Sequence, residues 1–226
     1  MTRLVLLHGS VTNAALTWRK QQALAAEYEL VTPDRPGFPP GPPVARVDFE
    51  ADVPWLEALV RPGDHLVAQS YGGLIALLAA PRLQLASLTV IEPPAFDVAR
   101  GDPAVERWLE QAFALPRDHP RTYVEGFLTH VGAPLRLPDP LPPALQQGAE
   151  AFLTERPPWE AKLRLAPLPY RVLVVSGNHE PAFEAVAGVL ERELRAERLI
   201  LPGAGHAVQN ARGFNDRLLE FLRRAP

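Results

Sequence analysis

Short apolar runs alternate along the chain with longer segments in which apolar residues recur at helical spacing. Six apolar runs predict buried strands, over residues 3–7, 29–32, 66–69, 87–91, 171–176 and 198–201. Most of the segments between them predict helices, over 14–26, 48–60, 71–80, 181–195 and 209–224. Runs of valine, leucine and isoleucine that alternate with helices are typical of a parallel sheet covered on both faces. We therefore expect an α/β fold with a mostly parallel central sheet of about six strands.

The alternation is interrupted between residues 93 and 170. This stretch holds more than half of the 26 prolines, and it predicts helices over 104–114, 122–131, 143–153 and 159–165. An insertion of about 75 residues is too long for a simple crossover between neighbouring strands. We expect residues 1–92 and 171–226 to form an α/β core, and residues 93–170 to form a helical, proline-rich cap over the ends of the sheet.

Composition narrows the class of protein. A chain of 226 residues can bury the core of one large α/β domain. The formal net charge is −3, so nucleic acid is not an expected partner. The absence of cysteine excludes disulfides, cysteine nucleophiles and thiolate metal sites. No apolar run is long enough for a signal peptide or a membrane span, and we expect a cytoplasmic protein with no membrane span.

The sequence carries no motif for a cofactor or a metal ion. A glycine-rich dinucleotide motif after the first strand and a Walker-type phosphate loop are both absent from the sequence. His179 and Glu180 are neighbours, but no third ligand lies near them in the sequence. We therefore expect no cofactor and no metal.

Polar residues follow several of the predicted strands, where sites lie in open α/β sheets. Ser70 follows the third strand within AQSYGG, and Glu92 follows the fourth. Glu180 follows the fifth strand, and His206 lies in a glycine-rich loop after the sixth. A serine, a carboxylate and a histidine therefore follow the third, fifth and sixth predicted strands, in that order along the chain. A serine hydroxyl needs an adjacent base to act as a nucleophile, and a histidine can be that base.

Five segments in this order resemble the α/β-hydrolase superfamily: LVLLHGS, PDRPGF, VAQSYGG, VVSGNHEP and LPGAGHAVQN. The resemblance covers nearly the whole chain and implies a sheet order of 2-1-3-4-5-6, without the N-terminal hairpin that many members carry. It implies that Ser70 is the nucleophile, His206 the general base and Glu180 the acid that orients the base. Glu92 is the main alternative acid, and Asp97 follows the same strand.

The resemblance also implies an oxyanion hole made of two backbone N–H groups. One belongs to Tyr71 and the other to Ser10, with Val11 as the alternative to Ser10. Asp34 and Arg35 are expected to connect loops beneath the site. The aromatic residues of the insertion are expected mainly to build the cap, with a few of them lining a substrate pocket.

Each assignment has a structural alternative. Ser70 could simply cap a helix, His206 could be a surface-loop histidine, and Glu180 could interact with a helix dipole. Two residues depart from the usual nucleophile motif: Ala68 replaces its first glycine, and Gln69 stands where many members have histidine.

The implied function is hydrolysis of a small-molecule carboxylic ester through an acyl-enzyme, with a small or medium apolar acyl group. The triad would equally serve a C–C bond hydrolase, a thioesterase or a cofactor-free peroxidase. A hydrolase-fold binding or receptor protein is the non-enzymatic alternative.

Overall fold

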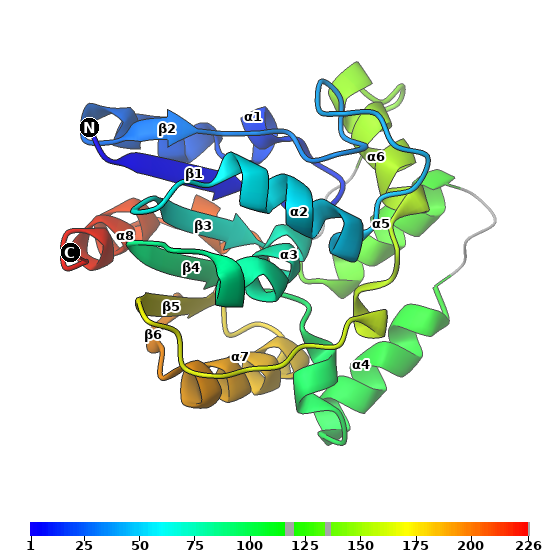
Figure 1. The fold of residues 1–226 in the computed structure, drawn as a ribbon. Coiled ribbons are helices and arrows are strands. Elements are labelled where there is room, and N and C mark those ends of the chain that lie inside the picture. Colours follow the sequence, from blue (N-terminus) through cyan, green and yellow to red (C-terminus); the bar gives the residue numbers. More distant parts are fainter. Residues whose placement is uncertain (116–119, 134–136, 226) are drawn as a thin grey trace.

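The computed structural model describes residues 1–115, 120–133 and 137–225, which fold around one sheet of six parallel strands (Figure 1). The strand order is β2-β1-β3-β4-β5-β6, which confirms the predicted order. The strands are β1 (Arg3–Leu7), β2 (Glu29–Val31), β3 (His65–Gln69), β4 (Ser87–Ile91), β5 (Arg171–Ser176) and β6 (Glu197–Ile200). Every pairing along the sheet is parallel, so the carboxyl ends of all six strands meet at one edge.

Helices cover both faces of the sheet because successive strand side chains point to opposite faces. In β1, Val5 and Leu7 pack in the hydrophobic cluster that includes helix α2 (Phe49–Leu59), α3 (Tyr71–Ala79) and α7 (Pro181–Leu194). Leu4 and Leu6 pack in a second cluster, with residues of α1 (Ala14–Thr17) and α8 (Phe214–Leu222). Strands buried on both faces explain why the apolar runs are nearly continuous.

Three predicted helices are shorter than the pattern indicates. The segment 14–26 is divided into α1 and a 3-10 helix, Arg19–Ala26, by the non-helical backbone at the buried Trp18. The final helix begins at Phe214, after the left-handed Gly213, and a 3-10 helix, Val208–Asn210, precedes it. Only the 3-10 helix Pro158–Glu160 forms in the segment 159–165.

Three helices of the insertion lie beyond the carboxyl ends of the strands (Figure 1): α4 (Pro103–Phe113), α5 (Pro120–His130) and α6 (Pro143–Thr154). Trp108 of α4 stacks on Phe96 and contacts Phe183 of α7, so α4 joins the main core. α5 and α6 pack around a separate cluster that includes Val124 and Phe152. The division into core and cap domains remains a prediction. Among the described residues, no helix combines the length and the apolar character needed to cross a membrane.

Candidate active site

Ser70 occupies a sharp turn between β3 and α3. Its backbone angles are φ 52° and ψ −125°, a region that non-glycine residues seldom adopt and that costs about 1–3 kcal/mol. Its side chain makes no capping hydrogen bond to the helix that it precedes. The strained turn instead presents the hydroxyl at the carboxyl edge of the sheet, as in the nucleophile turn of α/β-hydrolases.

Close backbone approach explains which small residues this turn needs. A Cβ at Gly72 would lie 2.4 Å from the carbonyl oxygen of His8, so only glycine lets α3 pack against the loop after β1. A Cβ at Gly9 would lie 2.8 Å from the Cβ of Ser70. Ala68, by contrast, lies inside β3 and its methyl group is buried in the main cluster. The alanine that replaces the usual first glycine therefore fits, because its methyl group packs in the hydrophobic core.

His206 connects Ser70 to a buried carboxylate. Its Nε2 lies 2.9 Å from the Ser70 hydroxyl, and its Nδ1 lies 3.3 Å from Oε2 of Glu92. Glu92 directly follows β4 with a positive φ of 48°, and its Oε1 accepts a 2.7 Å hydrogen bond from the backbone N–H of Gly177. All three side chains are buried. Because Nδ1 of His206 faces a carboxylate, we assign the ring proton to Nδ1. Nε2 then carries the lone pair that can accept the serine proton.

The carboxylate beside His206 is Glu92, not Glu180. Glu180 is the N-cap of α7, where its side chain accepts a hydrogen bond from the backbone N–H of Ala182. The prediction that Glu180 lies beside His206 is therefore corrected, since Glu92, the alternative, lies there and Glu180 sits at a helix N-terminus. The physical reason is that Glu180 is the N-cap residue, which commits its carboxylate to a backbone N–H in the first turn of α7. Which carboxylate acts as the catalytic acid stays a prediction.

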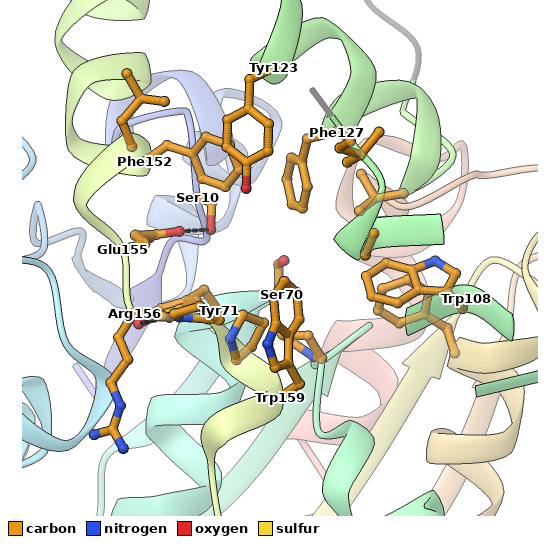
Figure 2. A pocket seen from close by; sticks show the side chains of 18 residues that line it. Ser10, Ser70, Tyr71, Trp108, Tyr123, Phe127, Phe152, Glu155, Arg156 and Trp159 are labelled. Carbon is orange, nitrogen blue, oxygen red and sulfur yellow. Dashed lines mark hydrogen bonds between the residues drawn. The ribbon is translucent and has the colours of Figure 1, made fainter. Parts of the chain in front are cut away.

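An aromatic cavity of about 200 Å³ opens above Ser70, whose hydroxyl points into it (Figure 2). Four elements of the insertion contribute its aromatic walls, which are formed by Trp108, Tyr123, Phe127, Phe152 and Trp159. Tyr123 and Phe127 both pack against Phe152 at ring-centroid distances of 5.3 and 4.5 Å. More aromatic side chains line the pocket than the few that the sequence pattern predicts, because α4, α5, α6 and the 3-10 helix Pro158–Glu160 all turn aromatic side chains toward the sheet edge.

One end of the cavity is polar. Ser10 donates a 2.5 Å hydrogen bond to Glu155 (Figure 2), and Arg35 forms an ion pair with the same carboxylate. Arg35 is fully buried and its guanidinium lies 4.7 Å from the centre of the Tyr71 ring. Burial raises the pKa of Glu155, and it raises the pKa of the neighbouring Asp52 to about 6. Arg35 therefore pairs with Asp52 of α2 and with Glu155 of the insertion, a residue that the sequence pattern did not single out. Its expected role in connecting loops stays a prediction.

His8 stabilises the loop that carries Ser10. Burial and the nearby charge of Arg35 lower the pKa of His8 to about 3, so the imidazole is neutral. Its Nδ1 donates to the carbonyl oxygen of Gly9, and its Nε2 accepts from the backbone N–H of Arg35. Ser10 and Tyr71 both line the cavity beside Ser70. Their backbone N–H groups, with that of Val11 as the alternative to Ser10, remain the predicted oxyanion donors.

The six-stranded parallel sheet and the sharp turn at Ser70 are features of the α/β-hydrolase fold, and comparison with known proteins shows the same family. A model of the alpha/beta hydrolase family matches residues 4–217, so the chain belongs to that family. The pimeloyl-[acyl-carrier protein] methyl ester esterase of Aeromonas salmonicida (strain A449) is 39% identical over 100 residues. That match covers 41% of this chain and 39% of the relative, so the chain spans about two fifths of the length of this relative.

Solved structures show the same fold. MenH from S. aureus superposes with a TM-score of 0.73 at 19% identity, covering 98% of this chain and 93% of that one. The esterase RhEst1 from Rhodococcus sp. ECU1013 superposes with a TM-score of 0.68 at 21% identity, covering 100% and 91%. At these identities the likeness concerns the fold alone.

Proposed function

We propose that the protein is a serine hydrolase that cleaves a carboxylic ester through an acyl-enzyme. The observation that carries the proposal is the pair of contacts of His206, 2.9 Å to the Ser70 hydroxyl and 3.3 Å to Glu92. A serine hydroxyl is a weak nucleophile and needs an adjacent base, which this geometry provides. The strained turn at Ser70 supports the same role, since stored strain concentrates at functional sites.

The proposed reaction has two halves. Ser70 attacks the ester carbonyl while Nε2 of His206 takes the hydroxyl proton and then gives it to the departing alcohol. Water then attacks the acyl-serine, with His206 again acting as base and then returning the proton to Ser70 as the acid leaves. Glu92 keeps the Nδ1 proton in place and stabilises the imidazolium. The backbone N–H groups of Tyr71 and Ser10 would bind the oxyanion of each tetrahedral intermediate.

The cavity favours an apolar group of small or medium size. Apolar side chains, many of them aromatic, supply most of its wall, while Ser10 and Glu155 form a polar end. The pimeloyl esterase relatives act on a methyl ester, which supports ester chemistry for this chain. We infer a substrate whose apolar acyl or alcohol part occupies the aromatic wall, with the ester carbonyl held at Ser70.

Measuring the hydrolysis of a panel of p-nitrophenyl esters of increasing acyl length tests this proposal. A chelator in the assay removes divalent metal ions, so that the turnover measured is that of the metal-free protein. We expect saturable turnover that peaks at a short or medium chain and is lost in Ser70→Ala. Thioester and C–C cleavage substrates in the same panel test the neighbouring chemistries. Unchanged ester turnover in Ser70→Ala would exclude the mechanism, and turnover only of a thioester or C–C substrate would redirect it.

A further inference from the structure

A second histidine lies beside the acid of the proposed triad. His179 follows β5, and its Nε2–H donates a 2.9 Å hydrogen bond to the backbone carbonyl oxygen of Val131. The other nitrogen, Nδ1, therefore carries a lone pair in the neutral ring. It lies 3.7 Å from Oε1 of Glu92. Among the described residues this buried nitrogen has no hydrogen-bond partner.

The arrangement places two acceptor atoms against each other in a buried position. In the neutral ring, a lone pair of His179 faces a carboxylate oxygen, and the part of the chain that the structure describes places no donor between them. An unsatisfied buried acceptor costs about 1–3 kcal/mol. A bound cation removes this cost because it accepts electron pairs from both atoms.

The three side chains Glu92, His179 and His206 each offer one ligand atom, and these atoms all lie within 4.8 Å of one another. In a tetrahedral zinc site with bonds of about 2.1 Å, ligand atoms are about 3.4 Å apart. The short separations involve the two different oxygens of Glu92: Oε2 lies 3.3 Å from Nδ1 of His206, and Oε1 lies 3.7 Å from Nδ1 of His179. Since one ligand atom from each residue already lies within 4.8 Å of the others, side-chain movements of about 1 Å bring them to zinc spacing. Two imidazoles and one carboxylate form a donor set that zinc favours.

We propose that Glu92, His179 and His206 form a site for a divalent zinc-like cation that reversibly inhibits the proposed hydrolase. Coordination through Nδ1 of His206 moves the Nδ1 proton to Nε2, and the imidazole stays neutral. Nε2–H then donates to Ser70 and cannot take its proton. When Glu92 coordinates the same cation, it no longer accepts a hydrogen bond from Nδ1 of His206 and so no longer orients the base. The hydrogen bond from His179 to Val131 supports the site, because such bonds fix the tautomer and orientation of metal ligands.

Zinc titration by calorimetry on the Ser70→Ala variant tests the site without relying on catalysis. We expect one zinc ion per chain, and binding at least about tenfold weaker in His179→Gln and His179→Phe. The phenylalanine variant keeps a planar ring against Phe183, so it separates loss of the ligand from loss of packing. His130→Gln is the matched control: this cap histidine bonds the carbonyl oxygen of Trp108 and lies outside the cluster. Its zinc affinity should be unchanged.

Circular dichroism first confirms that each variant is folded. No saturable zinc binding, or equal affinity in a folded His179→Phe, would overturn the site. The inhibitory role rests on the proposed function and is tested on the active enzyme, where zinc should abolish ester turnover and a chelator should restore it. Full turnover at saturating zinc would overturn the inhibition. Absence of any ester turnover would instead count against the proposed function, while the calorimetry still decides the metal site.

Discussion

The substitution Glu92→Gln removes one charge at the base of the site and changes almost no volume. Its effect follows from the backbone N–H of Gly177, which points at Oε1 of Glu92 from 2.7 Å. This buried donor needs an acceptor, so the new amide must place its oxygen there. Its NH₂ group then faces Nδ1 of His206, where Oε2 lies 3.3 Å away in the native protein. A donor at that position holds His206 in the tautomer that carries its proton on Nε2.

A histidine held in that tautomer cannot accept the proton of Ser70. The corresponding amide substitution in a serine protease triad lowers kcat by about 10⁴-fold. We expect a similar loss here, equivalent to about 5.5 kcal/mol of transition-state stabilisation. The assay is the steady-state hydrolysis of the best p-nitrophenyl ester, with KM measured alongside kcat. KM should change little, because Glu92 does not line the cavity.

Glu180→Gln is the matched control, since it makes the same chemical change one strand further along the sheet. Glu180 caps α7, and an amide oxygen can still accept the hydrogen bond from Ala182. We expect kcat close to that of the native protein. A large loss of kcat in Glu180→Gln, together with near-native kcat in Glu92→Gln, would refute the assignment of the acid.

Three further predictions concern stability, each measured by urea unfolding. Glu155→Gln should lower the free energy of unfolding by about 3 kcal/mol, because it leaves the fully buried Arg35 with a weakened partner; no change would show that the pair contributes nothing. Burial raises the pKa of Asp52 from 3.8 to about 6, so the folded state holds this proton more tightly than the unfolded state. The protonated Asp52 therefore stabilises the fold below about pH 4, and this contribution is lost as the pH rises to about 6. Between these pH values, the free energy of unfolding of Asp52→Asn should rise by about 2–3 kcal/mol relative to that of the native protein. Parallel plots of unfolding free energy against pH for the two proteins would contradict this. Gly72→Ala should destabilise by about 3 kcal/mol because its methyl group meets the carbonyl oxygen after β1. Gly188→Ala, in open space on α7, should stabilise by about 0.5–1 kcal/mol, and equal effects of the two changes would refute the steric argument.

The sheet order and the Ser70–His206 contact could be predicted because local sequence carries them. Apolar runs of the right length predict the strands, and both residues lie in short loops directly after strands whose order the family motifs imply. Helix boundaries were less predictable: the 14–26 segment has helical spacing, yet burial of Trp18 divides it. Tertiary packing there outweighs local propensity.

The acid could not be chosen from the sequence because Glu92 and Glu180 both follow strands that end at the same edge. Their difference lies in the backbone at each position. Glu92 has a positive φ after β4 and points across to His206, whereas Glu180 directly precedes α7 and caps it. The contacts of Glu155 with Arg35 and of His179 with Glu92 join segments far apart in the chain. No local motif signals either contact.

Labelling with a fluorophosphonate probe, followed by intact-mass measurement and peptide mapping, tests most directly that Ser70 is an activated nucleophile. We predict one adduct per chain, located on Ser70, with labelling abolished in Ser70→Ala and strongly slowed in His206→Ala. Circular dichroism and thermal melting show whether each variant is folded. A folded native protein that takes up no probe, or that is labelled equally in Ser70→Ala, would contradict the proposed mechanism.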